Sequence, residues 1–415
     1  MKTVWIINQY ITSPEIDGDG YRHYYIGKYL KNHQYQSVLI TSSFSHAPYR
    51  NTRFNGLYQF VNKGIPTLIL KGNTYGSSSG VGRILSWFIF CFMLLLLPFI
   101  PKSKLPYPQV IVLSSLPLLP VLNVWLLRIL YPKAKFVFEI RDLWPLSAVQ
   151  IGGYSSSNPF IKFLAFLERT GYRIADYIVS VIPRADLHIE QVLGNRNFKF
   201  EWISNGHDIN DVDLPPLDEI ISTKFNSDIF KIGYAGTLVV ANPLDTIIEV
   251  IGKHYSGRVE FYILGDGPEK ERINGLCVNY DNIHLLGRAP RKYVHSFLTK
   301  MDTLFMGKGT KNSTIYKFGT SQLKTFDYFY AAKPIIQALC SDENPVKYAK
   351  AGYIVEPQNS QQLISVLDEL LGKSEEELSK MGANGHNYLL EHCTYEKIAA
   401  KFAKVMDELN LNAES

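Results

Sequence analysis

The stretch that decides the fold is Lys317-Phe-Gly-Thr-Ser-Gln-Leu-Lys-Thr-Phe-Asp-Tyr-Phe-Tyr-Ala-Ala-Lys-Pro-Ile-Ile336. Gly319-Thr320-Ser321 predicts a turn that ends in a helix N-cap, because a Ser side chain accepts hydrogen bonds from the amides of a first helical turn. Pro334 predicts the end of that helix, and the two isoleucines after it predict the start of a buried strand. The pattern is therefore turn, helix and strand.

The predicted helix carries the chemistry that a nucleotide diphosphate needs. A glycine turn before a helix presents free amides and the positive end of the helix dipole to phosphate oxygens. Lys324 adds a cation one turn into the helix, and Asp327 stands where a carboxylate could accept from ribose hydroxyls. On local features alone, an amphipathic helix with a Ser cap and an i,i+3 ion pair explains the stretch equally well. Its apolar stripe is Leu323, Phe326 and Phe329.

Length and composition indicate a globular protein of two or three domains. The chain has 415 residues, of which 46% are hydrophobic, and its net charge of +5 does not indicate a nucleic-acid binder. A slightly basic balance suits anionic nucleotide sugars and anionic lipid. The four cysteines are far apart in the sequence and form no CxxC pair, so a reducing cytosol is the expected compartment.

Both halves of the chain open with a strand followed by a glycine loop. A buried strand at 4–7, a loop containing Gly18 and Gly20, a helix at 21–32 and a strand at 37–41 predict a doubly wound α/β domain. Residues 42–83 are polar, aromatic and rich in glycine. The second domain begins at 231–237, after an acidic, proline-containing segment at 211–226 that marks the domain boundary. Ligands of such domains bind at the carboxyl ends of the strands.

Two charged groups allow more than one interpretation. Asp17-Gly18-Asp19 has the spacing of a metal-binding motif, but its place in the first loop favours a solvated loop. Arg141-Asp142 follows the predicted strand 135–140, where charged side chains normally face the ligand crevice. A structural ion pair beneath a loop is the alternative for Arg141-Asp142.

The segment at 84–100 is almost wholly apolar and barely reaches the ~20 residues that span a bilayer. Arg83 precedes it, and Lys102 and Lys104 follow it. Cationic flanks and borderline length favour insertion into one leaflet over a buried core helix or a true span. A span would also separate this segment from strands of the same sheet.

Several motifs together resemble retaining glycosyltransferase family 4, most closely its bacterial O-antigen and capsule branch. The shared motifs are Ser321-x-x-Lys324-x-x-Asp327-Tyr-x-x-Ala-x-Lys-Pro334, Glu139-Ile-Arg-Asp-Leu-Trp-Pro145, Tyr234-Ala-Gly236, Gly265-Asp-Gly-Pro-Glu269 and Asn205-Gly-His-Asp208. The resemblance covers nearly the whole chain and is thin in the first hundred residues. It implies an α/β fold of two Rossmann-like domains facing across a cleft, the glycosyltransferase B fold.

The resemblance also implies domain limits. We expect an acceptor-binding N-terminal domain at 1–210 with a membrane-associated segment at 84–101, a linker at 211–228, and a nucleotide-sugar-binding domain at 229–390. A C-terminal helix at 391–415 is expected to return to the first domain.

The resemblance assigns site residues as well. The catalytic residues that it implies are Lys324, Asp327, Arg141 and Asp142. The residues that it implies for donor binding are Gly20, Gly236, Thr237, Gly265, Gly267, Arg288, Lys317, Gly319, Thr320 and Ser321. Gly18 and Arg22 are expected on the acceptor side, and no metal ligand or cofactor is expected.

Two departures from the family pattern bear on this site. Many relatives carry paired acidic residues eight positions apart, and the partner position of Asp327 here is Gly319. Relatives also use an Arg and a Lys shortly after the Tyr-Ala-Gly turn to bind the diphosphate, and residues 237–245 contain neither. The phosphate charge is therefore expected to meet Lys324, Lys317 and Arg288, together with an amide nest at 319–321.

The expected activity is sugar transfer, with retention, from a nucleotide diphosphate sugar (UDP favoured) to a polyprenyl-linked saccharide in O-antigen, capsule or lipopolysaccharide biosynthesis. Such an enzyme would be cytoplasmic and monotopic on the anionic inner face of the bacterial plasma membrane, with no nucleic-acid partner. Two alternatives remain open. One is a nucleotide-sugar epimerase of the same architecture, and the other is a non-catalytic membrane scaffold.

Overall fold

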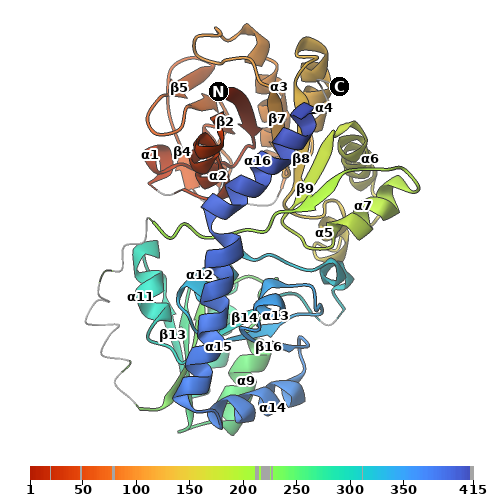
Figure 1. The fold of residues 1–415 in the computed structure, drawn as a ribbon. Coiled ribbons are helices and arrows are strands. Elements are labelled where there is room, and N and C mark those ends of the chain that lie inside the picture. Colours follow the sequence, from red (N-terminus) through yellow and green to blue (C-terminus); the bar gives the residue numbers. More distant parts are fainter. Residues whose placement is uncertain are drawn as a thin grey trace. The chain divides into compact units, whose positions relative to one another are not determined.

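The chain divides into two compact units (Figure 1). A computed structural model describes residues 1–18, 20–46, 49–76, 80–210, 215, 225, 228–310 and 312–411. The first unit comprises Met1–Ser204 and Tyr395–Ser415, and the second comprises Asn205–Thr394. The unit boundary thus falls before the predicted limit at residue 210, and most of the predicted linker 211–228 lies outside the described residues.

The first unit is built on an eight-stranded sheet in the order β10-β9-β8-β7-β1-β2-β6-β5. All neighbouring strands are parallel except β5 and β6. In chain order the strands are β1 (Lys2–Ile7), β2 (Tyr35–Ser42), β5 (Tyr58–Val61), β6 (Thr67–Leu70), β7 (Val110–Ser114), β8 (Lys135–Ile140), β9 (Tyr177–Ser180) and β10 (Phe200–Trp202). A separate antiparallel ribbon joins β3 (Phe44–His46) and β4 (Tyr49–Asn51). The central strands are buried apolar runs, as parallel strands covered on both faces require.

Helices α2 (Arg22–Leu30) and α16 (Tyr395–Leu411) lie side by side on this unit (Figure 1). Ile398, Phe402 and Met406 of α16 are buried in the same core as Val4 and Val112 of the sheet. The C-terminal helix is therefore part of the first unit. The other helices of the unit are α1 (Pro14–Asp17), α3 (Val81–Leu94), α4 (Val121–Leu130), α5 (Leu146–Gln150), α6 (Pro159–Ile174) and α7 (Ala185–Leu193).

The second unit has a wholly parallel six-stranded sheet in the order β13-β12-β11-β14-β15-β16. Its strands are β11 (Phe230–Ala235), β12 (Val259–Leu264), β13 (Ile283–Gly287), β14 (Thr303–Gly307), β15 (Ile335–Ala338) and β16 (Gly352–Val355). Its helices are α9 (Asp245–His254), α10 (Lys270–Cys277), α11 (Val294–Leu298), α12 (Leu323–Tyr330), α13 (Pro345–Ala349), α14 (Ser360–Leu371) and α15 (Glu375–Tyr388). In both units the chain order starts near the middle of the sheet and runs outward, so the expected pair of doubly wound domains is confirmed.

Candidate functional site

The helix α12 begins one residue later than the sequence indicates. Its N-cap position is Gln322, which makes no side-chain cap, so the prediction that Ser321 caps the helix is wrong. Instead the Ser321 hydroxyl accepts from the amide of Asn205 at 2.9 Å, and the Ser321 carbonyl accepts from Asn205 Nδ2 at 2.6 Å. This contact, from a residue distant in the sequence, takes the hydroxyl that a local cap would have used.

The turn before α12 leaves a row of amides for an anion. Gly319 has a φ of 89°, a left-handed conformation that favours glycine, and its amide donates to the Tyr316 carbonyl at 2.8 Å. Within the described part of the chain, the amides of Thr320, Ser321 and Gln322 have no hydrogen-bond acceptor. Free amides at a helix start bind phosphate well. The three amides at 320–322 thus lie one residue closer to the helix than the predicted nest at 319–321.

Lys324 lies against the glycine turn that follows β11. Its Nζ donates to the Tyr234 hydroxyl at 3.0 Å and lies 4.2 Å from the centre of that ring. A Cβ added to Gly236 would lie 2.7 Å from Lys324 Nζ, so glycine makes room for the ammonium group. Burial, together with the nearby charge of Lys308, lowers the pKa of Lys324 to about 7, although Asp327 opposes this shift.

The three predicted donor-site glycines after β11 and β12 hold two turns against each other. A Cβ on Gly265 would lie 2.1 Å from the Gly236 carbonyl oxygen, and one on Gly267 would lie 2.3 Å from the Leu238 carbonyl oxygen. Gly236 and Gly267 also have φ values of 154°. Thr237 is exposed on the first of these turns. The turns therefore need glycine, and their packing fixes the strand ends beside Lys324.

The other predicted phosphate cations are exposed, whereas Lys324 lies against the Gly236 turn. Lys317 is exposed, with its Nζ 4.9 Å from the centre of the Phe318 ring, and Arg288 is exposed after β13. Among the described residues, no hydrogen bond or ion pair joins either cation to the amide row or to Lys324. Lys308, directly after β14, is instead the cation close enough to lower the pKa of Lys324. The sequence indicated a cation-rich loop but did not assign Lys308 to the site.

Asp327 meets two histidines that the sequence did not assign to the site. Its Oδ1 lies 3.1 Å from His207 Nδ1 and 3.9 Å from His295 Nε2. Burial alone would raise the pKa of Asp327, but the hydrogen bond and charge of His207 outweigh it and keep that pKa below its usual value. The carboxylate oxygen that was predicted to accept from ribose is thus held by histidine. His207 belongs to the Asn205-Gly-His-Asp208 motif, whereas nothing in the sequence singles out His295.

At the carboxyl end of β8 in the first unit, Glu139 is completely buried and paired. Arg22 Nε donates to Glu139 Oε1 at 2.8 Å, and His23 Nε2 lies 2.7 Å from Oε2. Burial alone would raise the pKa of Glu139, but Arg22 and His23 outweigh it and hold that pKa well below its usual range. The rest of the Arg22 guanidinium donates to the carbonyls of Ile203 and Ser204. The buried Arg22 guanidinium therefore serves the fold, and its predicted acceptor-side role stays a prediction.

Substitution Glu139→Gln is expected to destabilise the first unit by about 3–5 kcal/mol, because it leaves the buried Arg22 charge without its partner. The contribution of Glu139 is present above its unfolded pKa of about 4.3 and is lost as pH falls through the lower folded value. Urea unfolding at neutral pH measures the change. The exposed pair Glu249–Lys253 supplies the control Glu249→Gln, which should leave the midpoint nearly unchanged. Equal midpoints for the two variants would contradict this account of Glu139.

The remaining predicted residues of the first unit have mainly local contacts. The amide of Arg141 donates to Ser115 Oγ at 3.0 Å, while its buried Nε has no partner among the described residues. Asp142 Oδ1 accepts from the Ser147 hydroxyl and the Leu143 amide, at 2.5 and 2.9 Å, so it stabilises the start of α5. Gly18 ends α1 with a φ of 76°, and a Cβ on Gly20 would press against Tyr24 at 2.9 Å. Arg141 thus keeps a free donor, whereas Gly18 and Gly20 serve the backbone.

The proposed metal motif in the first loop is only partly described. Asp17 Oδ2 pairs with Arg50 at 3.2 Å and accepts from the Ser13 amide at 2.9 Å, whereas Asp19 lies outside the described residues. Asp17 also lies in the short helix α1, which forms where a loop was expected. Its carboxylate therefore has a structural partner.

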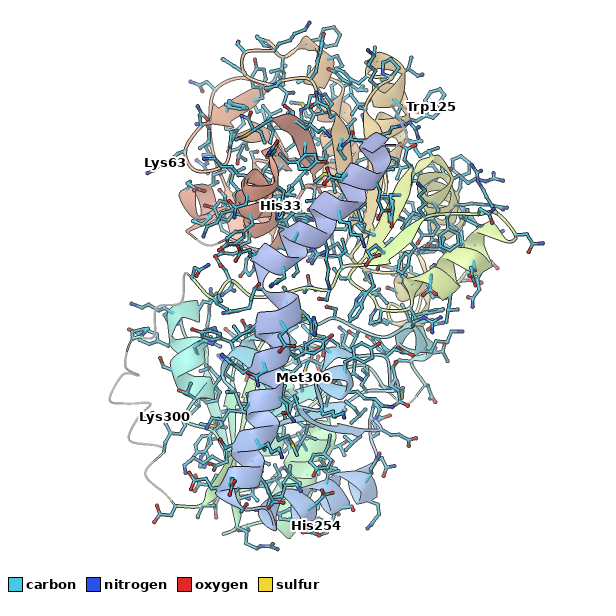
Figure 2. All side chains as sticks on the ribbon, in the orientation of Figure 1. His33, Lys63, Trp125, His254, Lys300 and Met306 are labelled. Carbon is cyan, nitrogen blue, oxygen red and sulfur yellow. The ribbon has the colours of Figure 1, made fainter. Side chains whose placement is uncertain are left out.

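A large apolar surface lies on α3 and α4, which are joined by Asn123 Nδ2 donating to the Cys91 carbonyl at 2.8 Å. Within the described residues, the helical run Val81–Phe99 is the one long and apolar enough to cross a membrane, and a third of it is buried. Its exposed side chains recur every three or four residues, the spacing of one helix face. The exposed apolar residues are Val81, Leu85, Phe88, Phe92, Leu95 and Phe99 of this run, with Leu122, Trp125, Ile129 and Leu130 of α4. Figure 2 shows Trp125 at the outer edge of the first unit.

The two sheets, parallel except at the β5–β6 pair, and their helices have the glycosyltransferase B fold, and solved structures of that architecture match the chain. No protein-family model matches the sequence, and neither does any curated protein. Sucrose-phosphate synthase from Thermosynechococcus elongatus superposes with a TM-score of 0.71 at 13% identity, covering 99% of this chain and 100% of that one.

Two further structures carry a nucleotide or nucleotide sugar. The E. coli trehalose-6-phosphate structure bound with UDP-2-fluoro glucose has a TM-score of 0.72 at 12% identity, with 98% and 99% coverage of this chain and that one. Anabaena HepE in complex with UDP and glucose has a TM-score of 0.64 at 13% identity, again with 98% and 99% coverage. At these identities the similarity establishes the fold.

Proposed function

We propose that this protein is a glycosyltransferase that moves a sugar, with retention, from a nucleotide diphosphate sugar to a lipid-linked saccharide. The observation that carries the proposal is the group at the carboxyl ends of β11 and β14. There Lys324 lies against the Gly236 turn, and the amides of Thr320, Ser321 and Gln322, just before it in the chain, have no acceptor among the described residues. UDP is the favoured nucleotide, since structures of the same fold are bound with UDP or UDP sugars.

In the proposed reaction, these groups would assist the departure of a diphosphate. Negative charge develops on the leaving oxygen, and fixed amides and ammonium groups stabilise it without reorganising. Lys324 and Lys308 supply the positive charge in place of the Arg and Lys that relatives carry after the Tyr-Ala-Gly turn. The resemblance to family 4 implies that the new bond forms on the face that the diphosphate leaves, and that the donor phosphate takes the acceptor proton. No protein nucleophile is then needed.

We infer a lipid-linked acceptor from the apolar surface on α3 and α4. A soluble helix normally buries such a face, and the lysines at 102 and 104 that follow it are exposed. Apolar side chains with cations at their edge suit the anionic inner leaflet of a bacterial plasma membrane, where a polyprenyl-linked saccharide would lie. Arg141, with its unpartnered Nε, is proposed to act on the acceptor side of the reaction. The product would belong to the O-antigen of a lipopolysaccharide or to a capsule.

Thermal stabilisation by nucleotides tests the donor site. A ligand that binds only the folded protein raises its melting temperature. At a ligand concentration of 100 times the Kd, the free energy of unfolding increases by about 2.7 kcal/mol. We expect UDP to raise the Tm more than GDP or dTDP, and Lys324→Ala to remove the shift. Stabilisation by none of the three would overturn the proposal and would favour a scaffold. Epimerised nucleotide sugar formed from donor alone would favour an epimerase.

A further inference from the structure

Three side chains from separate elements of the second unit converge around one carboxylate oxygen. His207 follows the start of the unit, His295 lies on α11, and Asp327 lies on α12. Asp327 Oδ1 is 3.1 Å from His207 Nδ1 and 3.9 Å from His295 Nε2, and one ligand atom from each residue lies within 4.8 Å of the others. Two imidazoles and a carboxylate are a common donor set for Zn²⁺ and other first-row ions.

His295 lacks the hydrogen bonds that a buried imidazole normally has. Only 9% of the residue is exposed, and its Nδ1 is buried without a partner among the described residues. Its Nε2 points toward Asp327 Oδ1 at 3.9 Å, which is beyond hydrogen-bond length. Burying polar nitrogens without partners costs free energy, and a cation between Nε2 and Oδ1 would supply the interaction that Nε2 lacks at this distance.

The ring packing restricts how far these histidines can move. The rings of His207 and His295 are 4.9 Å apart and nearly perpendicular, at 72°. Tyr330 stacks on His207 at 4.8 Å and meets His295 edge-on at 5.0 Å. Side chains held by stacking keep their nitrogen atoms directed at a fixed point, as a metal site requires.

The spacing of the donor atoms fits a small ion after a modest contraction. Bonds of about 2.0–2.2 Å in a tetrahedral site put neighbouring ligand atoms about 3.3–3.5 Å apart. The spacing of 3.1 Å is slightly shorter than this, and the others, of 3.9 Å and at most 4.8 Å, are longer by up to about 1.5 Å. A pocket of about 340 Å³ opens beside His295 and is also lined by Ile209, Thr299, Tyr330, His386 and Leu390. Water in this pocket could complete the coordination.

We propose that His207, His295 and Asp327 bind one divalent transition-metal ion, with Zn²⁺ the best chemical match. The ion would tie α11 and the segment at His207 to α12, one turn after Lys324. It would therefore fix the helix that carries the anion site. No metal ligand was expected from the sequence, which carries no signal for this site because the three residues lie far apart in the chain and match no metal-binding motif. The proposal does not depend on sugar transfer.

Metal binding by the full chain tests this directly. Tag-free protein stripped with a chelator is titrated with Zn²⁺ by calorimetry, and with Co²⁺ by its visible d–d absorption. We expect one equivalent of each to bind, and Zn²⁺ to raise the Tm. Replacing one ligand, as in His295→Ala or His207→Ala, should weaken Zn²⁺ binding by more than the 10–100-fold that loss of an outer-sphere partner typically costs.

His254→Ala is the matched control, since His254 is exposed at the end of α9 (Figure 2). It should bind Zn²⁺ like the wild type. His295→Gln, which keeps a polar side chain beside the pocket, provides a second variant if His295→Ala fails to fold. The proposal is overturned if the wild type binds no equivalent of Zn²⁺, or if the folded His295 and His207 variants bind it as tightly as His254→Ala does.

Discussion

Substitution Lys324→Ala is expected to lower turnover at saturating donor and acceptor by about 10²–10³-fold, the typical loss when one fixed donor to a developing anion is removed. The ammonium group of Lys324 lies at the Gly236 turn, one turn after the free amides of Thr320 and Ser321. In the proposed reaction it would therefore act where the diphosphate charge grows in the transition state. Initial rates of sugar transfer measure the loss, and the Tm of the variant without nucleotide shows whether the fold is kept.

The pH dependence of UDP binding tests whether Lys324 binds the diphosphate as a cation or has only a structural role. Its pKa is lowered to about 7, mainly by burial, so the side chain is mostly neutral in the free protein above that pH. A diphosphate binds the charged form, so binding above pH 7 must take up a proton. The Kd for UDP should therefore rise by up to about tenfold per pH unit between about pH 7 and 9. Lys324→Met should bind UDP weakly throughout and lose this slope.

Lys317→Ala is the matched control for Lys324, because Lys317 lies in the same motif but is exposed. Its transfer rate should stay within about twofold of the wild type, since an exposed charge is screened by solvent. If Lys317→Ala and Lys324→Ala lowered the rate equally, the reaction would depend on the net charge of the loop. A full rate for Lys324→Ala would remove Lys324 from the mechanism.

Local sequence patterns predicted the sheets well. The strand Lys135–Ile140 was expected at its observed limits, because a short apolar run followed by the charged pair Arg141-Asp142 indicates a buried strand and its end. Residues 42–83, in contrast, suggested only a polar, aromatic and glycine-rich region, yet the described part of this range contains four strands. Of these, β6 is fully buried and apolar, at Thr67–Leu70. All four strands are only three or four residues long, too few for a strand pattern to be recognised in the sequence.

The site was harder to predict, because its important contacts join distant residues. Lys324 and Gly236 were assigned from their own motifs, and the structure brings them together. The sequence could not show that Asn205 would take the Ser321 hydroxyl, or that Asp327 would meet His295, since neither contact leaves a local pattern. For the same reason, Arg22 suggested a binding residue, although it neutralises a carboxylate 117 positions away.

The double substitution Phe92→Asp/Trp125→Asp is expected to abolish binding to anionic vesicles. The side chains of Phe92 and Trp125 are 69% and 59% exposed on the apolar surface of α3 and α4. Inserting a large apolar side chain contributes about 1.5–3 kcal/mol, and every 1.4 kcal/mol is about tenfold in affinity. Losing two such side chains and adding two negative charges should weaken binding by at least about 100-fold. Flotation with vesicles containing phosphatidylglycerol measures this.

The control Leu57→Asp/Val278→Asp makes the same chemical change at two exposed apolar residues outside α3 and α4. The test variant and the control add equal negative charge, so any difference in their binding to vesicles is due to the apolar surface itself. Wild-type binding should also weaken in salt, because the exposed lysines at 102 and 104 contribute about 1 kcal/mol each near an anionic surface. If both double variants float as the wild type does, α3 and α4 are not the membrane contact, and the case for a lipid-linked acceptor loses its structural basis.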